Sequence, residues 1–93
     1  MEKWFVYIIR CKDGSFYTGA TNDLKRRFLE HKKGKGGRYT RSHIPEKIVF
    51  SEKCDNKITA LKREREIKDW TRKEKLKFIK QAGVAQLARA RHS

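Results

Sequence analysis

Lys-Trp-Phe-Val-Tyr-Ile-Ile-Arg-Cys-Lys-Asp-Gly-Ser-Phe-Tyr-Thr-Gly-Ala, residues 3–20, is the stretch that decides the fold, because two strand-forming runs flank a turn signal. The first run, Trp4–Cys11, is rich in aromatic and β-branched residues and is apolar on both alternating sets, which favours a strand covered on both faces. Lys-Asp-Gly at residues 12–14 then supplies a turn. The stretch therefore predicts a β-hairpin.

The length of the hairpin loop decides which side chains share a face of the sheet. With a two-residue Asp-Gly turn, Tyr7 and Tyr17 project from opposite faces, because side chains alternate along a strand. With a three-residue loop at residues 12–14, Gly14 takes the left-handed position of a G1 bulge, and the tyrosines become diagonal neighbours on one face. Gly19 then lies opposite Tyr7 and is expected to leave open space above the sheet. Only this second register lets both tyrosines reach one ligand.

The composition indicates one small, strongly basic domain. A chain of 93 residues with 37% hydrophobic residues suffices for a single modest core. We expect the domain to occupy residues 1–82 and residues 83–93 to form a disordered basic tail. Twenty-five Lys and Arg residues against 11 Asp and Glu give a net charge of +14, which favours a polyanionic partner, and nucleic acid above all.

Several classes of protein are disfavoured by the same composition. No apolar run approaches the length of a membrane span and no signal-peptide core follows the N-terminus, so we expect a cytoplasmic protein with no membrane partner. Cys11 and Cys54 stand alone, which argues against a zinc knuckle or a disulfide framework and for plain reduced thiols. The chain is taken as a monomer.

After the hairpin, the sequence predicts a helix that follows the capping residues 21–23, runs to about Lys33 and is stopped by Gly34. At 100° per residue, Arg27 and His31 fall beside the apolar stripe of this helix and face the sheet. Their i, i+4 spacing makes them neighbours, as two groups that grip one phosphate need to be. Taken alone, His31 is more often a packed or surface histidine, and Arg27 more often a helix-face residue with its charge in water.

The stretch Gly34–His43 has the glycines of a flexible loop, together with cationic residues and one aromatic residue. Such a loop lets the backbone approach phosphate, and its cations neutralise it while the aromatic ring stacks on a base. The alternative is a solvated loop whose charge only aids solubility. The candidate nucleic-acid-binding residues are Lys35, Arg38, Tyr39 and Arg41.

The second half of the chain predicts a strand at residues 47–52 and helices over about residues 57–70 and 71–80. In the first of these helices, Glu64 lies within the apolar face, between Leu61 and Ile67. A carboxylate in that position needs a partner or a cation. The simplest partner is Lys68, at the i, i+4 spacing of a weak helical ion pair.

Val6-Tyr7-Ile8, followed ten residues later by Tyr17-Thr18-Gly19, resembles the paired motif of the GIY-YIG nuclease superfamily. The match continues through Arg27 and His31, the glycine-rich basic stretch and the acidic helix at residues 60–64, so it covers residues 3 to about 80. The chain most resembles the small stand-alone members with a single domain. It departs from the family pattern in having Val6 where the name motif begins with Gly, and in lacking the Asn that some catalytic members carry after the acidic helix.

The resemblance implies an α/β fold and divalent-metal-dependent cleavage of DNA phosphodiester bonds. By the same resemblance, Tyr7 is expected to deprotonate or position the attacking water. Tyr17 is expected to orient water or phosphate. Arg27 is expected to stabilise transition-state charge, His31 to orient the water or share its proton, and Glu64 to hold one Mg²⁺ or Mn²⁺ ion. Because a free tyrosine has a pKa near 10, we expect nearby positive charge to lower the pKa of Tyr7.

We therefore predict an α/β domain with a small three-stranded antiparallel sheet, its first strand in the middle, and three helices, and with Tyr7 and Tyr17 on one face. The expected function is an endonuclease of DNA repair or recombination that recognises DNA structure rather than sequence, with no organic cofactor. The alternative is a non-catalytic nucleic-acid-binding module that keeps the nuclease fold. A third possibility, an accessory protein of RNA or ribosome assembly, rests on charge alone.

Overall fold

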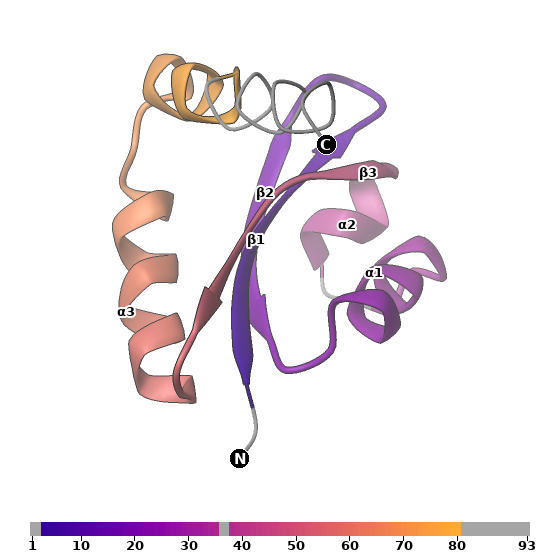
Figure 1. Cartoon of the computed structure of the whole chain (residues 1–93). Coiled ribbons are helices and arrows are strands. Elements are labelled where there is room, and N and C mark those ends of the chain that lie inside the picture. The colour runs from indigo at the N-terminus through magenta and orange to yellow at the C-terminus, as the bar shows by residue number, and fades with distance from the viewer. Residues whose placement is uncertain (1–2, 36–37, 81–93) are drawn as a thin grey trace, which may run out of the picture.

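The computed structural model describes residues 3–35 and 38–80, which form one sheet with helices on both of its sides (Figure 1). The chain is also helical over residues 72–80. The strand order is β2-β1-β3, and both pairings are antiparallel, which confirms the predicted fold class with its first strand in the middle. In chain order the elements are β1 (Trp4–Cys11), β2 (Phe16–Thr21), α1 (Leu24–Lys32), α2 (Arg38–Ser42), β3 (Pro45–Cys54) and α3 (Lys57–Lys68).

The hairpin between β1 and β2 has the three-residue loop. The backbone N–H of Cys11 donates to the carbonyl of Ser15 at 2.8 Å, and the N–H of Gly14 donates to the carbonyl of Cys11 at 2.9 Å. Gly14 has a φ of +87°, the left-handed conformation that a G1 bulge needs and that glycine adopts without a steric penalty. Tyr7 pairs with Gly19 in this register, so both tyrosines lie on one face as predicted.

The two faces of the sheet belong to different clusters. One alternating set of β1 side chains packs under α3 and the helix at 72–80, in a cluster built on Val6, Ile8, Phe50, Cys54, Ala60 and Ile67. The other set packs under α1, in a smaller cluster built on Tyr7, Ile9 and Cys11. Figure 1 shows α1 and α2 on one side of the sheet and α3 on the other. The apolar character of both sets in β1 is thus explained by helices on both faces.

The helix starts follow the capping chemistry of the sequence. The side chain of Asp23 accepts from the N–H of Arg26 at the start of α1, and that of Asn56 accepts from the N–H of Thr59 at the start of α3. Thr71 and Glu74 exchange hydrogen bonds at the start of the helix at 72–80, as in a capping box.

The structure also differs from the sequence expectations in several places. The helix α2 forms inside the stretch expected to be a loop, and β3 extends beyond residues 47–52 at both ends. In α3, Ala60 and Ile67 are buried, but Ile58 and Leu61 are 68% and 44% exposed, so the apolar face is narrower than predicted. The expected tail at 83–93 lies outside the described residues. None of the helices within the described ranges is long and apolar enough to cross a membrane.

Candidate active site

The most buried polar contact of the molecule's described part joins β1 to α1. The hydroxyl of Tyr7 and Nε2 of His31 are 2.9 Å apart, and these residues are 2% and 0% exposed. Strand β1 holds Tyr7 at its centre, while His31 lies in the last turn of α1 and faces the sheet, as the helical periodicity predicted. A polar pair buried this far must satisfy its own hydrogen bonds, so each side chain fixes the position of the other.

The pKa values of this pair show which group holds the proton. Burial, with the positive charge of Arg27, lowers the pKa of His31 to about 4, so its imidazole is neutral at pH 7. Burial, with the nearby Tyr17, raises the pKa of Tyr7 to about 12, although Arg27 acts in the opposite direction. The expectation that positive charge lowers the pKa of Tyr7 is therefore wrong for the protein alone, because desolvation outweighs Arg27 and His31 carries no charge. In the tautomer that carries its proton on Nδ1, neutral His31 accepts a hydrogen bond from the Tyr7 hydroxyl at Nε2.

Tyr17 completes an aromatic group around this hydrogen bond. Its ring centroid is 6.3 Å from that of Tyr7 and 4.9 Å from that of His31, the latter in an edge-on arrangement. We expected open space above Gly19 from the sequence. This expectation is wrong, because the ring of Tyr7 lies over this residue. A Cβ atom at Gly19 would come within 2.5 Å of the Tyr7 hydroxyl oxygen. Glycine at this position is thus required by the tyrosine that packs on it.

Arg27 stands beside the aromatic group at the border with solvent. Its guanidinium forms an ion pair with Glu30 at 3.1 Å, and its side chain is 32% exposed. Burial alone would lower the pKa of Arg27, but hydrogen bonds with Glu30 and Tyr7 outweigh it and raise the pKa. The sequence interpretation missed Glu30, although its i, i+3 spacing from Arg27 is a signal for such a pair.

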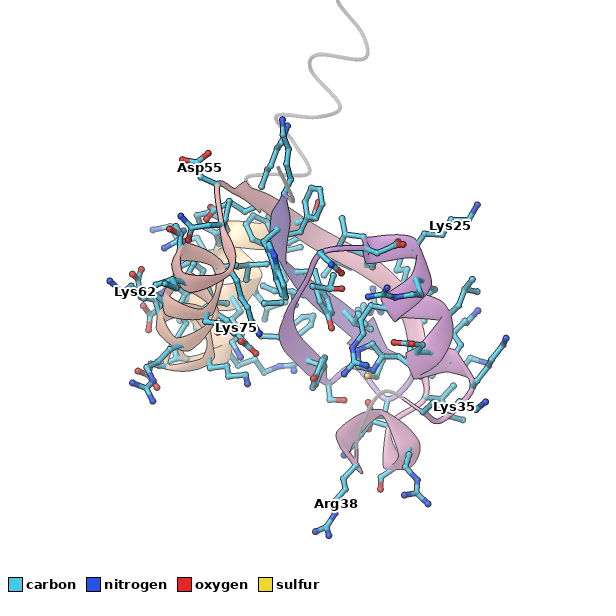
Figure 2. The ribbon with its side chains drawn as sticks, turned by 90° about the horizontal axis from the view of Figure 1, so that it is seen from below. Lys25, Lys35, Arg38, Asp55, Lys62 and Lys75 are labelled. Atoms are coloured by element: carbon cyan, nitrogen blue, oxygen red, sulfur yellow. The ribbon has the colours of Figure 1, made fainter. Side chains whose placement is uncertain are left out.

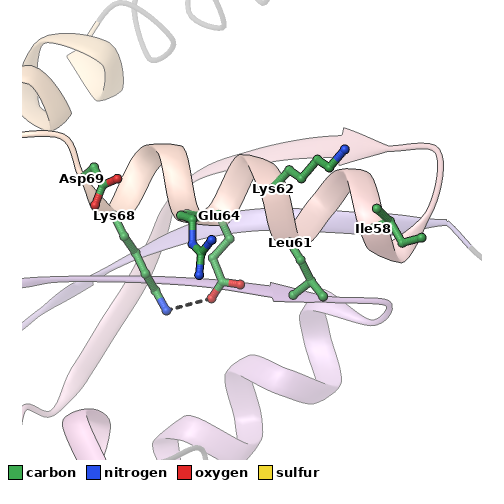
Figure 3. A pocket seen from close by; sticks show the side chains of 7 residues that line it. Ile58, Leu61, Lys62, Glu64, Lys68 and Asp69 are labelled. Carbon is green, nitrogen blue, oxygen red and sulfur yellow. Dashed lines mark ion pairs between the residues drawn. The ribbon is translucent and has the colours of Figure 1, made fainter.

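Glu64 approaches the site from α3, which covers the opposite face of the sheet. Its side chain is 16% exposed, and its carboxylate pairs with Lys68 at 3.0 Å, the partner that the helical spacing suggested. Figure 3 shows both side chains extending from α3 toward β2, which is an edge strand. A group at the edge of a sheet is able to act on either face, and the negative charge of Glu64 does contribute to the raised pKa of Tyr7. Glu64 thus belongs to α3, on one side of the sheet, whereas Tyr7 lies in the cluster on the α1 side.

The side chains at the site determine which kind of metal ion could bind there. Within residues 3–35 and 38–80 there is no group of three or more His, Cys, Asp or Glu side chains of the kind that encloses a metal. Two carboxylates lie near the site: Glu30, which pairs with Arg27, and Glu64, which pairs with Lys68. Mg²⁺ keeps several waters and takes phosphate oxygens as ligands, so one carboxylate beside a phosphate site fits such an ion, whereas it does not fit zinc.

The candidate nucleic-acid-binding residues lie at the end of the molecule where α1 passes to α2. Lys35, Arg38 and Arg41 are exposed, and Lys35 and Arg38 extend away from the body of the protein (Figure 2). Arg38 and Arg41 are three residues apart on α2, so the helix rather than a flexible loop presents them on one side. The side chain of Tyr39 lies outside the described part of the structure.

A polar cluster that the sequence interpretation missed ties the hairpin loop to the end of α2. Asp13 accepts from Ser15 and lies 2.6 Å from Nδ1 of His43, and the N–H of Lys12 donates to the carbonyl of Ile44. The hydrogen bonds from Ser15 and, to a smaller extent, the hydrogen bond with His43 hold the pKa of Asp13 well below its usual range. The local Asp-Gly-Ser signal predicts the first contact, but the 30 residues that separate Asp13 from His43 hide the second.

The sequence matches a known protein family over most of its length. The family model of the GIY-YIG catalytic domain matches residues 3–77. A UPF0213 protein of Staphylococcus saprophyticus is 47% identical over 79 residues, which cover 85% of this chain and 96% of that protein. A UPF0213 protein of Staphylococcus epidermidis is 48% identical over 81 residues, which cover 87% of this chain and 99% of that protein.

Two solved structures resemble the fold. The solution NMR structure of a UPF0213 protein from Bacillus halodurans has a TM-score of 0.55 at 39% identity and covers 85% of this chain and 84% of its own. The solution NMR structure of a protein from E. faecalis has a TM-score of 0.60 at 33% identity and covers 90% of each chain. The chain belongs to the GIY-YIG family, a nuclease superfamily, and to its small UPF0213 members.

Proposed function

We propose that this protein is a divalent-metal-dependent endonuclease that hydrolyses DNA phosphodiester bonds. The observation that carries the proposal is the buried Tyr7–His31 hydrogen bond at 2.9 Å, with Tyr17 and Arg27 beside it. A neutral imidazole that accepts from a phenol is a proton-transfer pair, and its position next to a guanidinium suits a substrate with negative charge.

Tyr7 and His31 act together on the attacking water. The water gives a proton to the hydroxyl oxygen of Tyr7 while the hydroxyl proton of Tyr7 passes to Nε2 of His31. The water oxygen then forms a bond to phosphorus, the bond from phosphorus to the leaving sugar oxygen breaks, and that oxygen takes up a proton from solvent water. This sequence needs no free phenolate, which agrees with a Tyr7 pKa of about 12.

Arg27 and Tyr17 hold the phosphate in this scheme. A guanidinium has more N–H donors than its pair with Glu30 uses, so Arg27 is able to donate to a non-bridging oxygen and stabilise the charge that develops there. Tyr17, which is half-buried, orients the phosphate or the water from the open side of the aromatic group. Glu64 holds a single Mg²⁺ or Mn²⁺ ion, which supplies Lewis-acid stabilisation of the leaving oxygen when bound.

The substrate is DNA recognised by structure rather than by sequence, in repair or recombination. Lys35, Arg38 and Arg41 contact phosphates, and phosphate contacts position a nucleic acid without reading its bases. Tyr39, from the same stretch, stacks on a base. The net charge of +14 supports the same partner.

Cleavage of labelled DNA in Mn²⁺ tests the proposal, with flap, branched, nicked, duplex and single-stranded substrates in parallel. The wild type is expected to cut at least one of them, and Glu64→Ala and Glu64→Gln to lose cleavage by roughly 100-fold or more, because the metal ligand is removed. DNA affinity of Glu64→Gln should stay the same or rise, since a negative charge beside the phosphates is lost. Cleavage by Glu64→Gln at the wild-type rate would contradict the proposal.

A non-catalytic nucleic-acid-binding module is the second candidate, and the Glu64–Lys68 pair at 3.0 Å favours it, because a carboxylate that only pairs with lysine needs no metal. Under this alternative, all labelled substrates are bound and none is cut. Glu64→Gln then changes stability by no more than about 0.5 kcal/mol.

A further inference from the structure

A basic hollow lies on the α3 side of the sheet, at the end where the hairpin loop joins β1 to β2. It has a volume of about 380 Å³ and lies between the sheet and the helix at 72–80, which is drawn in orange in Figure 1. Its cationic side chains are Arg10, Lys47 and Arg72, and its apolar ones include Phe16 and Leu76. A hollow of this size accommodates a group as large as one nucleotide.

The three cations of the hollow come from three different elements. Arg10 and Lys47 are partners in the register of β1 with β3, and like charges directly opposite each other on a sheet repel. Arg72 adds a third positive charge from the first turn of the helix at 72–80. No carboxylate is among the described residues that line the hollow, and Arg10 pairs with Glu46 only at 3.7 Å, with both side chains about half exposed. Such a solvated pair contributes little, so an anion in the hollow would relieve the repulsion.

Arg72 also forms a flat platform in the hollow. Its guanidinium carbon is 5.0 Å from the ring centroid of Phe16, and its Nη2 lies close to Gly14 of the hairpin loop. Leu76, one turn further along the same helix, is 45% exposed and lines the same hollow. A planar guanidinium beside an exposed leucine is a surface on which the face of a base stacks.

This combination of charge and platform fits an unpaired strand better than a duplex. A duplex keeps the faces of its bases stacked inside and presents phosphates, for which cations alone suffice. An unpaired strand also offers free base faces, and proteins that bind single strands combine cations with stacking surfaces. The apolar part of the hollow is therefore explained by a single strand and not by a duplex.

The hairpin loop lies next to both this hollow and α2. Gly14 lines the hollow, whereas the adjacent Asp13 lies 2.6 Å from Nδ1 of His43, directly after α2. The helix α2 lies on the other side of the sheet (Figure 1). A DNA molecule that crosses the hairpin loop would thus meet the cations of α2 on one side and those of the hollow on the other.

We propose that the hollow binds an unpaired strand of the DNA substrate, with phosphates on Arg10 and Lys47 and a base stacked on Arg72, while the cations of α2 hold the adjoining duplex. The inference rests on the proposed nucleic-acid partner. It narrows the substrate class to DNA with a single-stranded arm, and it requires neither metal nor cleavage.

Fluorescence anisotropy in EDTA tests this by comparing a blunt duplex with the same duplex that carries an unpaired arm at either end of one strand. The wild type is expected to bind at least one armed duplex more tightly than the blunt one. Arg72→Lys keeps the charge but loses the planar group, so it should reduce this preference by about 5-fold or more and leave the affinity for blunt duplex unchanged. The control is Lys73→Gln, because Lys73 is exposed on the same helix and is not part of the described lining. It should keep the preference although it loses a full charge.

Two further changes separate stacking from charge. Leu76→Ser should weaken binding of the armed duplex only, because it removes apolar surface and no charge. Arg10→Gln and Lys47→Gln should each flatten the salt dependence of armed-duplex binding, by up to roughly 0.7 in the logarithmic slope for a phosphate of a single strand.

A wild type without preference for an arm, or an unchanged preference in both Arg72→Lys and Leu76→Ser, would overturn the inference. Neither result would touch the endonuclease proposal, which depends on cleavage by the wild type and its loss in Glu64→Gln. If the arm preference follows the prediction but the wild type cuts no DNA, the endonuclease proposal falls and the inference stands. A wild type that binds no DNA would overturn both.

Discussion

The two faces of the sheet are built from the same strand and serve different ends. On the α3 side, Val6 and Ile8 of β1 pack with apolar residues of β3 and α3. On the α1 side, Tyr7 and its neighbours pack against α1, and a buried phenol meets a buried imidazole. Alternation along β1 thus places one set of side chains in an apolar cluster and the other beside the buried Tyr7–His31 pair, to which we assign the chemistry in our proposal. The difference teaches that one strand can bury a polar pair on one face of the sheet while an apolar cluster supplies cohesion on the other.

The first prediction concerns a buried side chain on the α3 side of the sheet. Ile67 is fully buried there, so Ile67→Ala should lower the free energy of unfolding by about 2–5 kcal/mol, through reduced apolar burial and the cavity left behind. Leu61→Ala on the same helix is the control, because Leu61 is 44% exposed, and it should cost less than about 1 kcal/mol. Denaturant unfolding measures both, and equal losses would show that the α3 side is not the stabilising face.

The second prediction concerns acid and the α1 side. The pKa of His31 is about 4 in the folded protein and about 6.5 when unfolded, so the unfolded chain binds the extra proton between these values. The stability that neutral His31 contributes is therefore complete above pH 6.5 and is lost as the pH falls toward 4, by on the order of 3 kcal/mol. His31→Gln should remove this part of the pH dependence of unfolding. An identical pH dependence in wild type and variant would place the titration elsewhere.

Some features of the α1 side could be predicted from the sequence and others could not. The three-residue loop and the shared face of Tyr7 and Tyr17 were predicted correctly. The spacing alone left two loop lengths open, and the choice depended on both tyrosines reaching one ligand, because a change of one residue in the loop inverts the facing of a whole strand. The direction of the Tyr7 pKa shift was not predictable, because it depends on how deeply α1 buries the pair. Helical periodicity also placed His31 toward the sheet, but it does not say how strongly the neighbours desolvate it.

For α3, periodicity placed Glu64 in an apolar stripe but did not reveal on which side of the sheet the helix packs.

Contacts between residues far apart in the sequence were also missed. The contact between Asp13 and His43 depends on how the chain returns from α2 to β3, which no local pattern encodes. Likewise α2 was missed, since the glycines before Arg38 favour a loop and the helix is only 5 residues long.

The third prediction tests the close approach beneath Tyr7. In Gly19→Ala the new Cβ atom would come within 2.5 Å of the Tyr7 hydroxyl oxygen, so the ring must move and the bond to His31 must lengthen. We expect a loss of about 1–3 kcal/mol in the free energy of unfolding, as for overpacking in a core. Cleavage should fall with it under conditions where the variant is fully folded. Ala20→Gly, on the opposite face of the same strand, is the matched control and should leave the cleavage rate of the folded protein unchanged.

The smallest effect on folding is expected at the exposed basic residues. Replacing Lys35, Arg38 and Arg41 with Ala should leave the unfolding transition unchanged, since all three side chains are exposed. DNA binding should weaken and its salt dependence should flatten, because each side chain that no longer neutralises a phosphate reduces the logarithmic slope on duplex DNA by roughly 0.9. A salt titration of DNA affinity checks this, with Lys62→Ala as the control. An unchanged slope would place the DNA on another surface.

The measurement that tests the central claim most directly is the rate of Mn²⁺-dependent DNA cleavage by Tyr7→Phe, with DNA affinity measured on the same samples. Phenylalanine keeps the ring over Gly19 and removes only the hydroxyl that contacts His31. The account predicts that cleavage falls by about 100- to 10,000-fold, the usual contribution of a positioned proton-transfer group, while DNA affinity changes less than about 2-fold. Cleavage at the wild-type rate by a folded Tyr7→Phe would contradict the account, because the α1 side of the sheet would then carry no chemistry.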